Sequence, residues 1–319
     1  MRLEILYEFC NPYYLLRLIF ILLSYNLNLG KKCITIWEKY DKKWSDNLKI
    51  YISADIEGIS GIVSKAQLSP EGYDYQRARM LMTKEVNAAI EGAIEAGAKE
   101  IVVNDSHGPM TNIIIEALNP KASLITGTPK RLGMMEGIDD SYDGVIMIGY
   151  HSKMNTPGVL AHSYHGGVIS DISINGKSVG EFGINASVAG YFNVPVVLVS
   201  GDNILSDEVS AINDKIEKVV VKTTQGRYAA KCISPEIVHD MIKEKVKTAL
   251  SKIDNVPSTT VSGAIELKVS FLNSGLAEVA SIMPRTELIE PNIVLYSADN
   301  IIEIYRALMA MIHIASSIN

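Results

Sequence analysis

The sequence predicts an α/β fold, with a mainly parallel sheet flanked by helices, an inserted β-hairpin and a smaller C-terminal α+β part. From Leu48 onward, short β-branched runs alternate with helical stretches, which is typical of parallel α/β sheets. The runs are almost wholly apolar, as expected for strands that are buried on both faces. Between two alternating segments lies Asn175-Gly176, which is a strong signal of a two-residue hairpin turn.

The elements follow in order along the chain. A first strand is expected at 48–54, followed by a helix over 73–96, in which Met82, Val86 and Ile90 recur at helical spacing before Gly97. The other strands of the sheet are expected at 100–104, 123–126, 144–148, 194–200 and 218–223. The remaining elements are expected to be a hairpin over 168–179, helices over 181–191, from 201 to about 211 and over 235–250, a β segment over 261–272, and a closing helix over 298–314.

No internal repeat or low-complexity linker divides the chain, so any domain boundary is soft, and we place it near Ile204. Residues 48–203 are expected to form a metal-binding catalytic domain. Residues 204–319 are expected to form a C-terminal domain whose closing helix packs back on the first domain.

Composition narrows the class of protein. The 319 residues can bury a substantial core, and 30 Lys and Arg against 36 Asp and Glu give a net charge of −6. No basic run is present, so a nucleic-acid partner is not expected. The three cysteines, Cys10, Cys33 and Cys232, are too few and too scattered for a disulfide framework. We therefore expect a cytoplasmic protein.

Residues 1–47 differ from the rest, since they hold both tryptophans and two of the three cysteines. The apolar run at 13–23 resembles a membrane anchor, but Arg17 interrupts it and it is shorter than the ~20 residues of a spanning helix. Codons for residues 43–46 can contain a ribosome-binding sequence, and Leu48 can be an alternative start. We expect a non-native or disordered extension from a mis-assigned start, with a genuine extension and an anchor as alternatives. An intact-mass measurement tests this, and a native N-terminus at Met1 would contradict it.

Candidate ligands collect just past the ends of three expected strands. Asp55 and Glu57 follow the first strand, His107 lies in Asn-Asp-Ser-His-Gly after the second, and His151 follows the fourth. Because the carboxyl ends of parallel strands lie along one edge of a sheet, we expect these side chains to converge there.

The chemistry of this set is that of a metal site. Alternate residues of an extended segment point to the same side, so Asp55 and Glu57 would repel unless a cation lay between them. Two imidazoles added to these carboxylates form a donor set suited to zinc. The alternative is that the carboxylates cap a helix and the histidines are solvated.

Several other residues are open to two interpretations. Asp105 can orient a ligand histidine or form a local turn. His162 and His165 can each be either a catalytic residue or a surface imidazole. Glu181 lies at the start of an expected helix, where an acidic side chain interacts favourably with the helix dipole without any further function. No Walker A loop, GxGxxG helix start, GxSxG elbow or HExxH motif is present.

Together, these motifs resemble the zinc-dependent D-aminopeptidase family over 48–319. The residues that carry the resemblance are Ser-Ala-Asp-Ile-Glu-Gly at 53–58, Asn-Asp-Ser-His-Gly at 104–108, Gly-Tyr-His at 149–151, Leu-Ala-His-Ser at 160–163 and Gly-Glu-Phe-Gly-Ile-Asn-Ala at 180–186. The resemblance implies an aminopeptidase that hydrolyses short peptides, D-amino-acid peptides in particular, with water activated by two zinc ions per subunit. It also implies a ring-shaped homodecamer.

The resemblance assigns roles to six residues. Asp55 would bridge the two zinc ions, Glu57 and His107 would complete one site, and His151 and Glu181 would complete the other. The family's catalytic histidine corresponds to His162. An amidase or an L-specific peptidase on the same metals, or a ring-forming scaffold with vestigial activity, are the alternatives.

Overall fold

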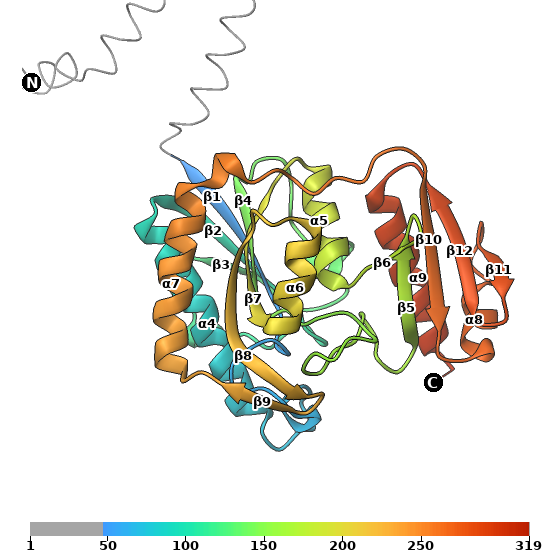
Figure 1. Cartoon of the computed structure of the whole chain (residues 1–319), viewed down its shortest axis with the longest axis horizontal. Coiled ribbons are helices and arrows are strands. Elements are labelled where there is room, and N and C mark those ends of the chain that lie inside the picture. Colours follow the sequence, from blue (N-terminus) through green and yellow to red (C-terminus); the bar gives the residue numbers. More distant parts are fainter. Residues whose placement is uncertain (1–46, 319) are drawn as a thin grey trace, which may run out of the picture. The chain divides into compact units, whose positions relative to one another are not determined.

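Two sheets organise the part of the chain that the structure describes (Figure 1). This computed structural model describes residues 47–318, so the predictions for residues 1–47 lie, apart from Asn47 itself, outside the described residues. The larger sheet has the strand order β3-β2-β1-β4-β7-β8-β9 and is parallel except for β9. Its strands are β1 (Leu48–Ala54), β2 (Ala98–Asp105), β3 (Ser123–Ile125), β4 (Gly144–Ile148), β7 (Val196–Asp202), β8 (Glu217–Gly226) and β9 (Ala229–Cys232).

Helices cover both faces of this sheet (Figure 1). On one face, α4 (Tyr75–Glu95) packs beside α7 (Pro235–Ser251), and on the other lie α5 (Glu181–Tyr191) and α6 (Asn203–Ile212). Successive side chains of β1 point to opposite faces of the sheet, so this strand contributes to the cores on both faces. Ile50 and Ile52 belong to the core with α4 and α7, whereas Tyr51 belongs to the core with Phe182 of α5.

The smaller sheet is antiparallel, with the order β11-β12-β10-β5-β6. Its strands are β5 (Ile169–Ile174), β6 (Lys177–Ser178), β10 (Ile265–Phe271), β11 (Glu287–Glu290) and β12 (Ile293–Ala298), and its helices are α8 (Ser274–Ala280) and α9 (Ile301–Ser316). The β5–β6 hairpin turns at Asn175-Gly176, both with positive φ, as the sequence predicts. Each sheet takes strands from both sides of Ile204, and a division into two domains there stays a prediction.

The predicted fold class is confirmed, while several local predictions need correction. The sequence analysis missed β9, α8, β11 and β12, and it began the closing helix at residue 298, which is the last residue of β12. The helix begins only after Asn300, whose side chain accepts a hydrogen bond from the Glu303 amide. Short single turns complete the described elements: η2 (Lys65–Gln67), η3 (Ile115–Ala117), η4 (Gly133–Met135) and η5 (Ile253–Asn255).

The strand order places a crevice at the carboxyl ends of β1 and β4. The chain runs outward from β1 through β2 to β3 and then crosses to β4 on the other side of β1. Such a reversal of strand order opens a space above the sheet, where ligands bind in open α/β folds. Within residues 47–318, no helix has the length and apolarity that crossing a membrane requires.

Candidate metal centre

The structure brings all six predicted site residues to this crevice. Asp55 and Glu57 follow β1, His107 follows β2, His151 follows β4, Glu181 is the first residue of α5, and His162 lies in the segment between β4 and β5. The three carboxylates are buried, with exposed fractions of 1% for Asp55, 2% for Glu57 and 4% for Glu181. Three carboxylates cannot share so dry a space without positive charge among them.

The donor atoms divide around the two oxygens of Asp55. On one side, His107 Nδ1 lies 3.2 Å from Asp55 Oδ1 and 2.9 Å from Glu57 Oε2. On the other, His151 Nε2 lies 3.5 Å from Asp55 Oδ2 and 3.3 Å from Glu181 Oε1. A single carboxylate therefore faces two separate pairs of donors, which is the arrangement that a bridging ligand requires.

Main-chain carbonyls fix the orientation of each imidazole. His107 donates from Nε2 to the Leu68 carbonyl at 2.7 Å. In the same way, Nδ1 of His151 donates to the Ser152 carbonyl at 3.0 Å, and Nδ1 of His162 donates to the Leu160 carbonyl at 3.0 Å. A neutral imidazole that donates from one nitrogen carries a lone pair on the other, and in all three rings that second nitrogen faces the carboxylates.

Three buried atoms of the cluster fit a cation. Asp55 Oδ2, Glu57 Oε2 and His151 Nε2 have no hydrogen-bond partner among the described residues. Such orphaned polar atoms are costly in a protein interior unless an ion or water satisfies them. Ligand atoms of Asp55, Glu57 and His151 also lie within 4.8 Å of one another. The residues present therefore fit zinc, which takes carboxylate and imidazole ligands.

The pKa values of the cluster reflect the same crowding of charge. Burial, followed by the neighbouring Glu57 carboxylate, raises the pKa of Asp55 to about 8. Burial lowers the pKa of an imidazole, but the facing Glu181, together with Asp55 and Glu57, outweighs it and raises the pKa of His151 to about 10. Protons thus compensate the carboxylates when no metal is bound, and a cation that enters the cluster displaces them.

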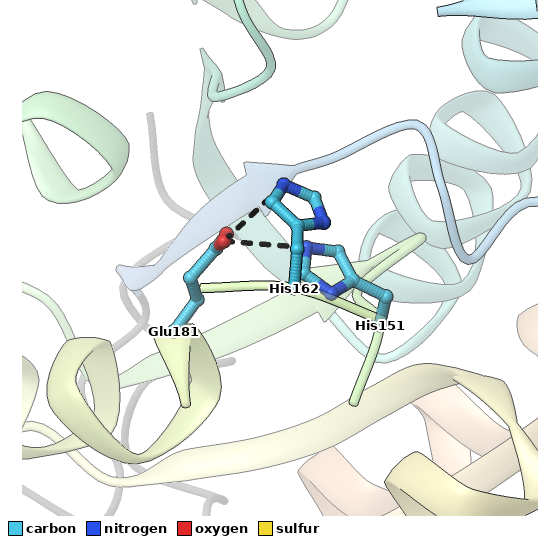
Figure 2. Close-up of side chains that lie close together, drawn as sticks. All are labelled: His151, His162 and Glu181. Carbon is cyan, nitrogen blue, oxygen red and sulfur yellow. Dashed lines mark ion pairs between the residues drawn. The ribbon is translucent and has the colours of Figure 1, made fainter. Parts of the chain in front are cut away.

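His162 also faces the cluster, and Figure 2 shows its ring beside that of His151 and near the Glu181 carboxylate. Its ring stacks on that of His151, with centroids 4.1 Å apart and an interplanar angle of 9°. Its Nε2 is 3.8 Å from Glu181 Oε1 and 4.0 Å from Glu57 Oε1. These distances are longer than those of the other two imidazoles, and His162 is also more exposed than His151.

A cavity of about 400 Å³ opens from the cluster. Its lining includes Asp55, His107, His162 and Glu181 of the cluster, together with residues of α9. The remaining lining is mostly apolar or aromatic, and it includes Met110, Met134, Tyr164, Tyr305, Met309 and Ile312. A small peptide can therefore lie with one end at the carboxylates and its side chains against an apolar wall.

A buried hydroxyl network supports the site, and the sequence analysis did not identify it. Ser53 Oγ lies 2.8 Å from Ser106 Oγ and 2.7 Å from the Tyr150 hydroxyl. Asn185 of α5 donates to the same tyrosine at 3.1 Å. The network ties β1, the loop after β2, the end of β4 and α5 together beneath the ligands. The only sequence signal is a serine within an apolar strand.

Two residues whose roles the sequence left open are now placed. Asp105 does not contact a histidine ring; its carboxylate accepts bonds from the amides of Asn112 and Ile113 at 2.5 and 2.7 Å. The Asn112 side chain in turn donates to the His107 carbonyl at 2.6 Å, so Asp105 shapes the loop that carries the histidine. His165 is exposed and lines the cavity, away from the carboxylates.

The segment after Glu57 rests on a buried carboxylate outside the cluster, Glu85 of α4. Glu85 Oε1 accepts a hydrogen bond from the Ser60 amide at 2.8 Å, while Oε2 has no partner among the described residues. Burial raises the pKa of Glu85 to about 7. The folded protein therefore keeps the Glu85 carboxyl protonated at pH values where the unfolded chain has already released this proton. The free energy of unfolding consequently falls as the pH rises from the ordinary pKa of 4.5 towards 7.

We predict that Glu85→Gln removes this pH dependence. The variant's free energy of unfolding, relative to the wild type, should increase by about 2 kcal/mol between pH 5 and pH 7.5, because the neutral amide has no proton to lose. Urea unfolding at the two pH values measures the change. Glu91→Gln, at an exposed position of the same helix, should show no such increase. A pH-independent difference for Glu85→Gln would contradict the prediction.

Comparison with known proteins identifies the family. A family model described as D-aminopeptidase matches residues 48–310. A D-aminopeptidase of Bacillus subtilis (strain 168) is 39% identical over 269 residues, covering 84% of this chain and 98% of that protein. The solved structure of the Zn-dependent D-aminopeptidase DppA from Bacillus subtilis, described as a self-compartmentalizing protease, superposes with a TM-score of 0.83 at 38% identity and covers the same shares of the two chains. The chain therefore belongs to the D-aminopeptidase family and is an enzyme of the hydrolase class.

Proposed function

We propose that this protein removes the N-terminal residue of short peptides, and of peptides that begin with a D-amino acid in particular, at a centre of two zinc ions. The observation that carries the proposal is the division of donor atoms around Asp55, with His107 and Glu57 on one oxygen and His151 and Glu181 on the other. The similarity to a Zn-dependent D-aminopeptidase supports zinc as the metal.

Five side chains would hold the metals. Asp55 would bridge the two ions, Glu57 and His107 would complete one site, and His151 and Glu181 would complete the other. When bound, a zinc pair supplies Lewis acidity, which activates water and polarises a carbonyl. Burial of the carboxylates keeps these charges out of bulk solvent, where their interactions would be weaker.

The chain's own residues position the substrate and move the proton. The cavity binds a short peptide with its amino end at the carboxylates and its side chains against the apolar wall. His162 presents Nε2 to this space, because its Nδ1 is held by the Leu160 carbonyl. From there it would accept a proton from the attacking water and pass it to the leaving amine, a role that typically contributes 10²–10⁴-fold to the rate. Glu181 is fixed for its role by the Tyr164 amide, which donates to Oε1 at 2.6 Å.

A set of four peptides tests the substrate class. The zinc-loaded enzyme is assayed with two tripeptides that differ only in the configuration of an N-terminal alanine, and with an N-acetylated form of each. We expect the D-peptide to be cleaved with a kcat/KM about tenfold or more above that of the L-peptide, and the acetylated forms to be inert. Preference for the L-peptide indicates an L-specific peptidase, cleavage of acetylated peptides indicates an amidase, and no cleavage indicates a scaffold with vestigial activity.

Assembly and cellular setting belong to the same proposal. The similar Bacillus protein is described as self-compartmentalizing, and we propose that this chain also forms a closed homo-oligomer, a ring of ten subunits in the cytoplasm. Light scattering on the purified protein tests the assembly. The proposal expects ten times the mass of the chain, and a monomer would contradict it.

A further inference from the structure

A buried lysine beneath the metal ligands has no place in the mechanism given above. Lys222 lies in β8 and has an exposed fraction of 1%. Its ammonium is bound by main-chain carbonyls rather than by a carboxylate. The three acceptors are the carbonyl oxygens of Glu57, Ile59 at 3.0 Å and Ile62 at 2.6 Å.

These three carbonyls belong to the turn that follows β1 and begins at Glu57. An ammonium group has three protons, so the three acceptors satisfy it completely. Burying a charge is costly, and carbonyl dipoles compensate only when they are aimed at it. The carbonyls of Glu57, Ile59 and Ile62 must therefore keep their directions for Lys222 to stay charged, and Lys222 in turn fixes the peptide groups of the turn.

The same turn is also hydrogen-bonded to the end of β4, so Glu57 has little freedom. The amide of Asp55 donates to the Ile148 carbonyl at 2.8 Å, and the amide of Gly58 donates to the Gly149 carbonyl at 2.7 Å. A Cβ atom at Gly58 would lie 1.9 Å from the Tyr150 carbonyl oxygen, so only glycine permits this approach. The end of β4 thus holds the turn through main-chain hydrogen bonds, and Lys222 holds it through three of its carbonyls.

We propose that Lys222 is a positioning residue that aims the Glu57 carboxylate at its metal. This inference rests on the proposed zinc centre. It predicts a selective effect, because Lys222 binds the Glu57 carbonyl directly but makes no contact with His151 or Glu181. Loss of the ammonium should weaken the site formed by Glu57 and His107 and leave the site formed by His151 and Glu181 at its normal affinity.

Competition between the enzyme and a chromophoric zinc chelator tests this selectivity. The metal-free Lys222→Met variant keeps most of the side-chain length without charge or donors. We expect one zinc ion to bind as in the wild type and the other to bind about 10–100-fold more weakly, the usual effect of losing a group that orients a ligand. Lys231→Met, on the exposed surface of β9, is the matched control and should bind both ions normally.

The outcomes separate this inference from the proposed function. If the wild type binds fewer than two zinc ions, the proposed function fails. If it binds two and a folded Lys222→Met binds both with unchanged affinity, or weakens both equally, the positioning role is overturned. Lys222→Gln, which keeps an amide donor, provides the same comparison if the methionine variant does not fold, and it should show a smaller loss at the same single site.

Discussion

Asp55→Asn should lose tight binding of both zinc ions and should hydrolyse peptides at least about 10³-fold more slowly. The reason is that each oxygen of Asp55 faces a different pair of donors, and an amide supplies one neutral oxygen where the carboxylate supplies two charged ones. The substitution preserves side-chain volume and leaves Oδ1 able to accept its bond from the Ile56 amide, 2.8 Å away. Elemental analysis after dialysis measures the zinc content, and steady-state assays measure the rate.

Asp207→Asn is the control for the Asp55 experiment, since Asp207 is an exposed aspartate of α6. It should retain two zinc ions per chain and full activity. Circular dichroism of both variants establishes that they are folded. A folded Asp55→Asn protein that keeps two zinc ions per chain would show that Asp55 is not the bridging ligand.

His162→Ala should reduce kcat by about 10²–10⁴-fold and leave the zinc content unchanged. The physical reason is the position of the ring, which stacks on His151 and keeps its Nε2 at 3.8 Å or more from the nearest carboxylate oxygens. His165→Ala is a matched control, because His165 lines the same cavity outside the carboxylate cluster, and its effect on kcat should be small.

Two results of the His162 experiment would contradict the assigned role. Normal turnover in His162→Ala would exclude a proton-transfer role. Loss of one zinc ion would make His162 a metal ligand, an arrangement that its distance from His151 and Glu181 also permits, since their ligand atoms lie within 4.8 Å of one another. Metal analysis and kinetics on the same preparation distinguish the two cases.

The parallel strands of the large sheet could be predicted from sequence because their signals are local, whereas β9, a four-residue strand antiparallel to β8, was missed. Each parallel strand contains a short apolar run, and the helices between them have a clear periodicity and recognisable ends. The smaller sheet depends on pairing between distant segments, such as Ile172 of β5 with Val269 of β10. Its strands β11 and β12 are short, and β12 runs into the helix α9 with only Asp299 and Asn300 between them. Local patterns do not specify such partners, which explains why these elements were missed.

The part of the candidate site that lies at the ends of the strands could be predicted from the sequence. Asp55, His107 and His151 all follow strand ends, so the topology alone predicts that they converge. Glu181 is different, because an acid at a helix start has a sufficient explanation in the helix dipole, and its ligand role came from the family resemblance. Lys222 could not be predicted at all, since its partners are main-chain carbonyls, and its only signal is a lysine after three valines in a strand.

Anomalous X-ray scattering from crystals of the zinc-loaded enzyme, measured at the zinc absorption edge, tests the central claim most directly. The account predicts two zinc peaks in each chain. One should lie among Asp55, Glu57 and His107, and the other among Asp55, His151 and Glu181. A single peak, or two peaks that do not share Asp55, would contradict the account.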